Sequence, residues 1–303
     1  AINLAIPDIG VDFNTGAALL SWIVTCYLLT TAALLLPFGR LADIVGRKKV
    51  FAAGLAVFSV ASLLCATAWS IQSLIVFRVV QGVGGAMIFG TAIAILTSVF
   101  PPQERGRVLG YNTAVVYTGL SLGPVLGGIL NHQFGWQSIF YCIALMGGLS
   151  LLMTVVKLKG EWSGAAGDSF DLTGAILYVT GIVAMLYGIS NVAASHWAGG
   201  ILLLGLAFIV LFVRHENRDD QPLIKMKLFK NTGFAFSNLA ALINYSATFA
   251  VSFLLSLYLQ VVKGLDSQTA GLVLLAQPVV MALLSPFAGR LSDHVEPRLL
   301  ASW

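Results

Sequence analysis

The feature that most constrains the fold of this chain is a set of long segments without a single Asp, Glu, Lys or Arg. Such segments include residues 13–39, 50–77, 108–156, 172–213 and 231–262. A helix needs about 20 apolar residues to cross a bilayer, so every one of these segments is long enough to do so. A transmembrane barrel would instead show alternating segments of ~10 residues. The sequence therefore predicts an all-α membrane protein.

Turn-forming residues divide the apolar segments into individual spans. Residues 1–6 are expected to be the tail of a first helix that Pro7 ends. The complete predicted helices cover residues 17–38, 50–69, 71–100, 108–130, 138–156, 172–191, 197–213, 232–262 and 270–287. Residues 222–229, PLIKMKLF, fit either a helix lying on the headgroups or a solvated connector.

The basic residues indicate how these helices are oriented. If successive loops lie on opposite sides, all Lys and Arg residues other than Arg78 and Lys263 fall on one side. Because Lys and Arg accumulate in cytoplasmic loops, this side is predicted to be the cytoplasm, where the N-terminus would also lie. The net charge of +4 is then a topology signal, and we expect no nucleic-acid partner. The expected location is the cell (plasma or inner) membrane.

Residues 39–50, GRLADIVGRKKV, place one acid and four bases between two spans in a chain with only 10% charged residues. We expect a cytoplasmic turn whose glycines permit a tight reversal and whose bases hold it at the inner leaflet. Asp43 could take a charge-assisted hydrogen bond or receive a helix N-terminus. A simple positive anchor would explain the bases but not the spacing. Residues 289–298, GRLSDHVEPR, partly repeat the pattern.

This pattern resembles the signature loop of the major facilitator superfamily. The matching positions are Gly39, Leu41, Asp43, Gly46, Arg47 and Lys48. In that family the loop is a cytoplasmic latch. The resemblance implies that Asp43 pairs with neighbouring helices while the outside is open and releases them when the inside opens. The second copy keeps Gly289, Arg290, Leu291 and Asp293 but lacks the Gly-Arg-Lys that follows in the first.

The distance between the two copies points to one branch of the superfamily, whose members consist of two six-helix halves related as parallel repeats. The second copy follows the tenth helix instead of the eighth, so two extra helices must lie between the halves. This resembles the 14-spanner drug:proton antiporters, of which the chain would hold roughly the first ten helices. The expected division is an N-terminal half with a truncated first helix (1–156), a linker with the two extra helices (157–231) and the start of the C-terminal half (232–303).

Arg78 is the only charge placed within a span. A central arginine costs at least ~2.5–3.5 kcal/mol on insertion scales and usually faces the bundle interior. The alternative is an arginine that snorkels to the outer headgroups. The segment from Arg78 to Gln81 and Gly82 resembles the family's helix-4 motif Arg-x-x-Gln-Gly, which implies that Arg78 takes part in proton coupling. The small residues Gly82, Ala86 and Gly90 indicate close helix packing, because no strand precedes them as a phosphate loop would require.

The fifth predicted helix carries a second face of small residues, and a proline within it should kink the helix. The pattern resembles the antiporter motif of exporters and consists of Gly119, Gly123, Pro124, Gly127 and Gly128. Tyr27, Gln81 and Asn112 lie on helices that line the cavity in the family. Each is expected to be either an interhelical hydrogen-bonding group or a ligand contact.

These features predict a proton-coupled exporter of hydrophobic or cationic small molecules that works by alternating access. The alternative within the family is a transporter of a defined metabolite such as a sugar, organic anion or siderophore. An enzyme is not expected, because the spans lack clusters of His, Asp or Glu. The cysteines lie in apolar segments without disulfide or metal spacing. We therefore expect no cofactor and no metal, with the lipid bilayer, protons and the substrate as partners of a monomer.

Overall fold

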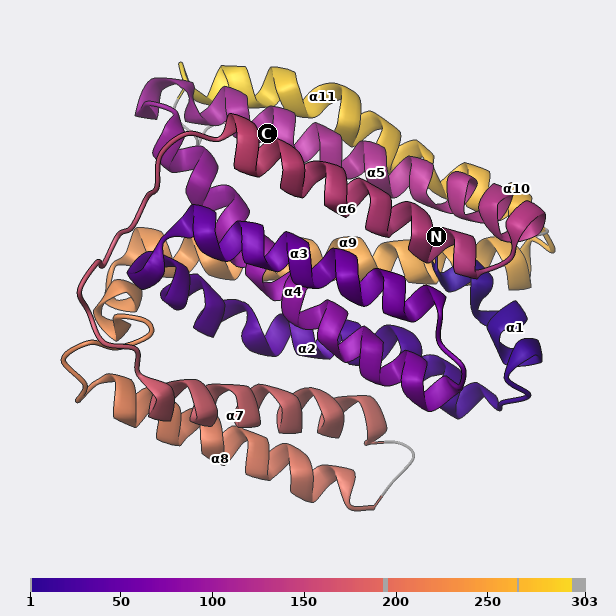
Figure 1. The fold of residues 1–303 in the computed structure, drawn as a ribbon, viewed down its shortest axis with the longest axis horizontal. Helices are drawn as coiled ribbons and strands as arrows, with labels where there is room; N and C mark the ends of the chain where they lie inside the picture. The colour runs from indigo at the N-terminus through magenta and orange to yellow at the C-terminus, as the bar shows by residue number, and fades with distance from the viewer. Residues whose placement is uncertain (1, 193–195, 266, 296–303) are drawn as a thin grey trace. The chain divides into compact units, whose positions relative to one another are not determined.

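A computed structural model describes residues 2–192, 196–265 and 267–295, and every regular element in these ranges is helical (Figure 1). The long helices are α1 (Ile2–Asp12), α2 (Ala17–Val45), α3 (Arg47–Ala66), α4 (Ile71–Val99), α5 (Arg105–Phe134), α6 (Gln137–Lys157), α7 (Leu172–Asn191), α8 (Ala198–Glu216), α9 (Thr232–Leu257), α10 (Ser267–Leu274) and α11 (Ala276–Ser292). Short 3₁₀ turns cover Pro102–Glu104 and Met226–Lys230, and a π-helical turn, Tyr258–Val262, follows α9.

Nine helical segments in the described part of the chain are long and apolar enough to cross a membrane. They correspond one to one with the nine complete spans expected from the sequence. The prediction of an all-α membrane protein is therefore confirmed.

The chain forms two compact units. Unit 1 comprises Ala1–Val99 and Val125–Lys225, and unit 2 comprises Phe100–Pro124 and Met226–Trp303. The boundary cuts through α5 because the beginning of this helix packs against α11. The sequence-based division at residues 156 and 231 concerns the halves of a repeat and stays a prediction.

The core of unit 1 is built around α4, which packs against α2 and α3. Glycines allow this close approach: a Cβ added at Gly84 would lie 2.6 Å from the backbone nitrogen of Phe58 in α3, and one at Gly82 would lie 2.9 Å from the carbonyl oxygen of Tyr27 in α2. Ala86 is fully buried between them. The small face of this helix thus serves interhelical packing, as expected.

The two helices predicted as extra, α7 and α8, form a hairpin whose members lie side by side (Figure 1). Glycines again set the distance, since a Cβ at Gly205 would lie 2.5 Å from the backbone nitrogen of Met185. One face of α7 also contacts α2 within unit 1.

The structure corrects two predicted helix ends. Pro7 does not end the first helix, because α1 continues to Asp12. The burial of Ala5 and Ile9 on both sides of the proline offsets the one backbone hydrogen bond that it removes. The helix predicted at 270–287 is divided between α10 and α11, since Pro278 has no N–H to bond the carbonyl of Leu274.

The predicted turn at residues 39–50 is also wrong in its extent. Helix α2 runs to Val45 and α3 begins at Arg47, so only Gly46 is non-helical. Its φ of 124° is a conformation that glycine adopts without steric cost. Residues 222–229 form no helix beyond the short turn that begins at Met226, which favours the connector interpretation.

Candidate functional site

The first signature motif forms a charged corner where α2 meets α3. The Arg47 guanidinium contacts one oxygen of Asp43, with Nε and Nη2 each 2.8 Å from Oδ1. Its Nη1 also donates to the carbonyl oxygen of Ala94 at 3.2 Å and to Ser98 Oγ at 2.5 Å, both near the end of α4. Arg47 therefore connects the α2–α3 corner to α4.

The segment between α6 and α7, residues 158–171, crosses this corner, and we call it the strap. Four hydrogen bonds join the strap to the corner. Arg47 N–H donates to the Trp162 carbonyl (2.8 Å), and Ala165 N–H donates to the Asp43 carbonyl (2.9 Å). Lys48 donates twice, from its N–H to Glu161 Oε1 (2.8 Å) and from Nζ to the Leu158 carbonyl. An ion pair adds to them, since Arg40 Nη2 lies 2.7 Å from Asp168 Oδ2. The strap thus holds the motif at its backbone as well as at its charges.

The two remaining positions of the first motif pack into unit 1. Gly39 faces Gly90, where a Cβ added to Gly90 would lie 3.3 Å from the Gly39 nitrogen. Leu41 packs against a small buried cluster that contains Val50 and Met87. These residues fix the position of the corner, and the latch role of Asp43 stays a prediction.

The second copy of the motif binds the beginning of α5. Gly106 N–H donates to Asp293 Oδ1 at 2.7 Å and Arg107 N–H donates to Oδ2 at 2.8 Å. A Cβ added to Gly289 would lie 2.8 Å from Gly110 Cα, so glycine permits the close crossing of α11 and α5. Arg290 donates to the Tyr111 hydroxyl. Asp293 therefore receives a helix N-terminus, the contact that the sequence suggested for its counterpart Asp43.

Arg78 lies inside unit 1 and is only 4% exposed. Its Nε donates to the Ile23 carbonyl at 2.9 Å, Nη1 donates to Gln81 Oε1, and Cζ lies 4.2 Å from the centre of the Tyr27 ring. Gln81 Nε2 in turn donates to Ser62 Oγ at 2.7 Å. Helices α2, α3 and α4 meet at this network. The guanidinium faces the interior of the unit, and within the described part of the chain no Asp or Glu pairs with it.

The structure brings together only some of the residues predicted to line a cavity. Tyr27 and Gln81 both contact Arg78, whereas Asn112 is a half-buried residue of α5 in unit 2. Gln81 is fully buried, and its amide is engaged in interhelical hydrogen bonds. A ligand contact for any of the three stays a prediction.

The predicted antiporter motif extends across the boundary between the units. Gly119, Gly123 and Pro124 belong to unit 2, while Gly127 and Gly128 belong to unit 1. Helix α5 continues through Pro124, and a Cβ added to Gly119 would have no neighbour within 4 Å. No helix therefore packs closely against Gly119 within unit 2, and the role of the motif stays a prediction.

A pocket of about 570 Å³ lies between α2 and α7 in unit 1. Trp22 and Tyr187 stack across it with ring centres 6.0 Å apart and an interplanar angle of 26°. Thr25, Ser190 and Asn191 add polar groups to the wall. Sequence reasoning missed this pocket. The only local signal was an aromatic residue in each of two spans, and nothing in the sequence paired those spans.

The sequence matches the Major Facilitator Superfamily over residues 1–303. It is 34% identical over 292 residues to the riboflavin transporter RibZ of Clostridioides difficile, covering 96% of this chain and 64% of that protein. It is 32% identical over 303 residues to the multidrug resistance protein Stp of Mycobacterium tuberculosis, covering 98% and 56%. The methylenomycin A resistance protein of Streptomyces coelicolor is 32% identical over 296 residues, with coverage of 96% and 62%. The chain thus spans 56–64% of the length of these relatives.

Proposed function

Because the chain belongs to the Major Facilitator Superfamily, as its signature motif predicted, we propose that it is part of a proton-coupled exporter of hydrophobic or cationic small molecules. Family membership and the nine apolar helical segments of the described residues identify an integral multi-pass membrane protein. The same membership indicates a transporter rather than an enzyme. We place it in the 14-spanner branch, with α7 and α8 as the extra helices, in the cell membrane with a cytoplasmic N-terminus and as a monomer.

The observation that carries the proposal is the attachment of Asp293 to the beginning of α5. In the proposed repeat α5 belongs to the first half and α11 to the second, so this contact joins the halves. It consists of charge-assisted hydrogen bonds at a helix N-terminus, which water can replace when the contact opens. A reversible attachment of this kind is what alternating access requires.

The buried Arg78 supports proton coupling. Its positive charge is held by a carbonyl, an amide and an aromatic ring, none of which neutralises it. Because such a charge is costly inside a membrane, a nearby change of protonation would alter its interactions strongly. The carboxylates of the described spans, those of Asp43, Glu104 and Glu216, all lie near span ends, so the proton carrier is proposed to lie outside the described residues.

The direction of transport and the substrate rest on relatives. Two of them are named for drug resistance, which favours export of lipophilic compounds, and the Gly-Pro motif of α5 resembles that of exporters. RibZ, named a riboflavin transporter, is similar at a comparable identity. The second candidate is therefore a transporter of one defined metabolite, and a planar aromatic compound would be its first test substrate.

The test uses the whole protein in inverted membrane vesicles in which respiration builds an interior-acid pH gradient, followed by a quenched dye. Addition of lipophilic cations should restore fluorescence, because each substrate molecule that enters a vesicle exchanges for protons. Asp43→Ala and Arg78→Ala should abolish this response at normal membrane insertion, while Arg78→Lys should keep part of it. Lys49→Ala, at an exposed base of the same corner, is the matched control.

Two results would redirect the proposal. Full fluorescence recovery with Arg78→Ala would remove Arg78 from proton coupling. A response to riboflavin together with no response to any lipophilic cation would replace multidrug export by transport of a defined metabolite.

A further inference from the structure

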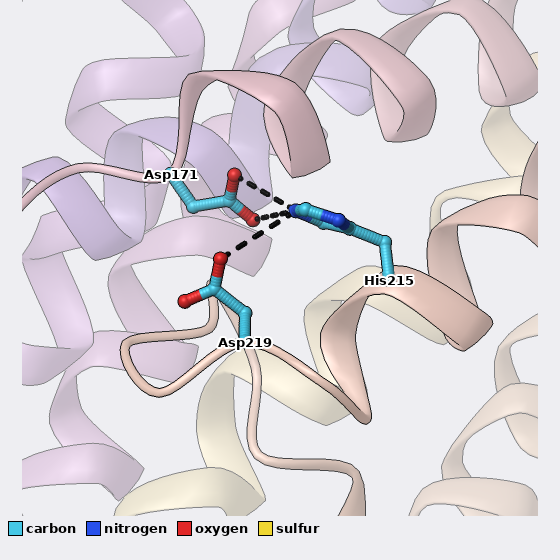
Figure 2. A group of neighbouring side chains, drawn as sticks. All are labelled: Asp171, His215 and Asp219. Carbon is cyan, nitrogen blue, oxygen red and sulfur yellow. Dashed lines mark hydrogen bonds and ion pairs between the residues drawn. The ribbon is translucent and has the colours of Figure 1, made fainter.

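A second polar cluster lies at the base of the α7–α8 hairpin in unit 1 (Figure 2). Asp171, the last residue of the strap, caps α7 by accepting the N–H of Gly174 at 2.8 Å. His215 in the last turn of α8 places Nε2 3.0 Å from Asp171 Oδ2 and 3.6 Å from Asp219 Oδ2. One oxygen or nitrogen from each of these three side chains lies within 4.8 Å of the others.

A fourth side chain faces the same cluster. Glu216 is 3% exposed, and its Oε2 accepts the Ile224 N–H at 2.9 Å. Its Oε1 is buried and has no hydrogen-bond partner among the described residues. A Cβ added to Gly174 would lie 2.6 Å from this oxygen and would also touch Asp171 Oδ2, so both oxygens face one point. A buried carboxylate oxygen without a partner is costly, and a cation bound beside it would lower that cost.

The cluster also carries an excess of negative charge. Three carboxylates surround one imidazole, and the ion pairs that the described residues form with Asp171 and Asp219 come from His215 alone. Even a protonated imidazole would leave a net negative charge, part of it at the well-buried Asp171. A divalent cation bound by the neutral imidazole would offset two of the three negative charges, whereas a proton on the imidazole would offset only one.

We propose that Asp171, His215 and Asp219 bind a divalent transition-metal ion, with the buried Glu216 carboxylate beside Asp171. An imidazole nitrogen together with carboxylate oxygens suits Zn²⁺ or Mn²⁺, whereas Mg²⁺ and Ca²⁺ prefer oxygen ligands throughout. Tetrahedral Zn²⁺ with bonds of ~2.0–2.1 Å places neighbouring ligand atoms ~3.3 Å apart. The distances from His215 Nε2 to Asp171 Oδ2 (3.0 Å) and to Asp219 Oδ2 (3.6 Å) lie on either side of that value.

Such an ion would join the beginning of α7 to the end of α8 at the point where the strap enters the hairpin. The strap already contacts the chain after α8 here, because Ser169 Oγ donates to Gln221 Oε1 at 2.6 Å. The metal would thus stabilise the segment that holds the first signature motif. The sequence-based expectation of no metal considered only the spans, and this cluster lies at their ends.

The test measures metal binding to the purified protein in detergent, after removal of the affinity tag and treatment with a chelator. Zn²⁺ alone and Co²⁺ alone are added, excess metal is removed by desalting, and bound metal is quantified. We expect one equivalent per chain, a visible absorption band of tetrahedral Co²⁺, and a higher unfolding temperature with metal. His215→Gln and Asp219→Asn should each lower the affinity about tenfold or more.

Matched controls separate the site from general metal adsorption. Asp220→Asn makes the same chemical change one residue away from Asp219, and His132→Gln replaces an exposed histidine of α5. Both should bind metal as the unmodified protein does. The proposal is overturned if the unmodified protein retains no metal, or if Asp219→Asn and Asp220→Asn bind it equally. The comparison of metal binding by Asp219→Asn and Asp220→Asn tests the proposal even if His215→Gln fails to fold.

Discussion

Replacement of Asp293 by asparagine should loosen the attachment of α11 to α5. The carboxylate accepts two backbone N–H groups, one at each oxygen, at the N-terminus of α5. Asparagine has one acceptor oxygen and no charge, so Asp293→Asn keeps at most one of these hydrogen bonds. The side chain is similar in volume, which makes the change one of hydrogen bonding and charge rather than of packing.

The size of the effect follows from these two losses. One hydrogen bond to a charged acceptor contributes ~1.5 kcal/mol at the low end of its range, which suits the half-exposed Asp293. The charge at a helix N-terminus adds ~0.3–1 kcal/mol. The attachment should therefore weaken by ~1.8–2.5 kcal/mol, which raises the population of the open contact about 20- to 70-fold.

A reporter thiol at Ser292 can measure this population. Ser292 is half-buried and its Oγ lies against Gly106, so it is partly covered while α11 is attached to α5. In a background without Cys26, Cys65 and Cys142, Ser292→Cys should react with a maleimide at a rate proportional to the open population. The Asp293→Asn version should react about 20- to 70-fold faster at low ionic strength.

Glu104→Gln is the matched control, because it removes one negative charge beside the same helix start without removing a bond to its N–H groups. It should change the labelling rate by less than about threefold. If Asp293→Asn reacts no faster than the control, the two hydrogen bonds do not hold the contact closed, and the reasoning about the second motif is refuted.

Two further predictions concern unit 1. Gly84→Ala should lower the free energy of unfolding by ~1–3 kcal/mol, because its Cβ would lie 2.6 Å from the Phe58 backbone nitrogen. Thermal unfolding in detergent should show this loss, whereas the control Gly199→Ala, whose Cβ would meet no neighbour within 4 Å, should show none. Asp168→Asn should raise hydrogen exchange in residues 158–171 only about two- to fivefold, because its ion pair with Arg40 is partly exposed and contributes ~0.5–1 kcal/mol. Unchanged exchange would mean that the backbone hydrogen bonds alone hold the strap.

The helices could be predicted because a membrane span is an additive property of a local window. Helix α7 illustrates this, since the predicted residues 172–191 are its observed bounds. The prediction failed where long-range contacts decide. Helix α2 continues through charged residues to Val45 because Arg47 and the strap, which follows more than 100 residues later, bond the groups at its end.

The candidate site could be predicted in part, because some of its residues belong to local sequence patterns. A motif of fixed spacing identified Asp43 and Asp293, and a lone charge in an apolar segment identified Arg78. The partners of these residues could not be predicted, because helices far apart in sequence supply them. The Ile23 carbonyl in α2 accepts a hydrogen bond from Arg78 in α4, and no local sequence pattern relates the two residues.

The two copies of the signature motif differ in a way that bears on how each would open. Both contacts from Arg47 go to Oδ1 of Asp43, whose side chain is 36% exposed, so this carboxylate keeps a cationic partner on its own corner. The second copy lacks the Gly-Arg-Lys that supplies this arginine, and both oxygens of Asp293 depend on the N–H groups of α5. Separation of α11 from α5 therefore exposes an Asp293 carboxylate that has no other hydrogen-bond donor among the described residues, whereas Asp43 keeps its bond to Arg47 when another partner leaves it. Since an opened contact is more costly when no internal partner remains, the second copy should resist opening more strongly than the first.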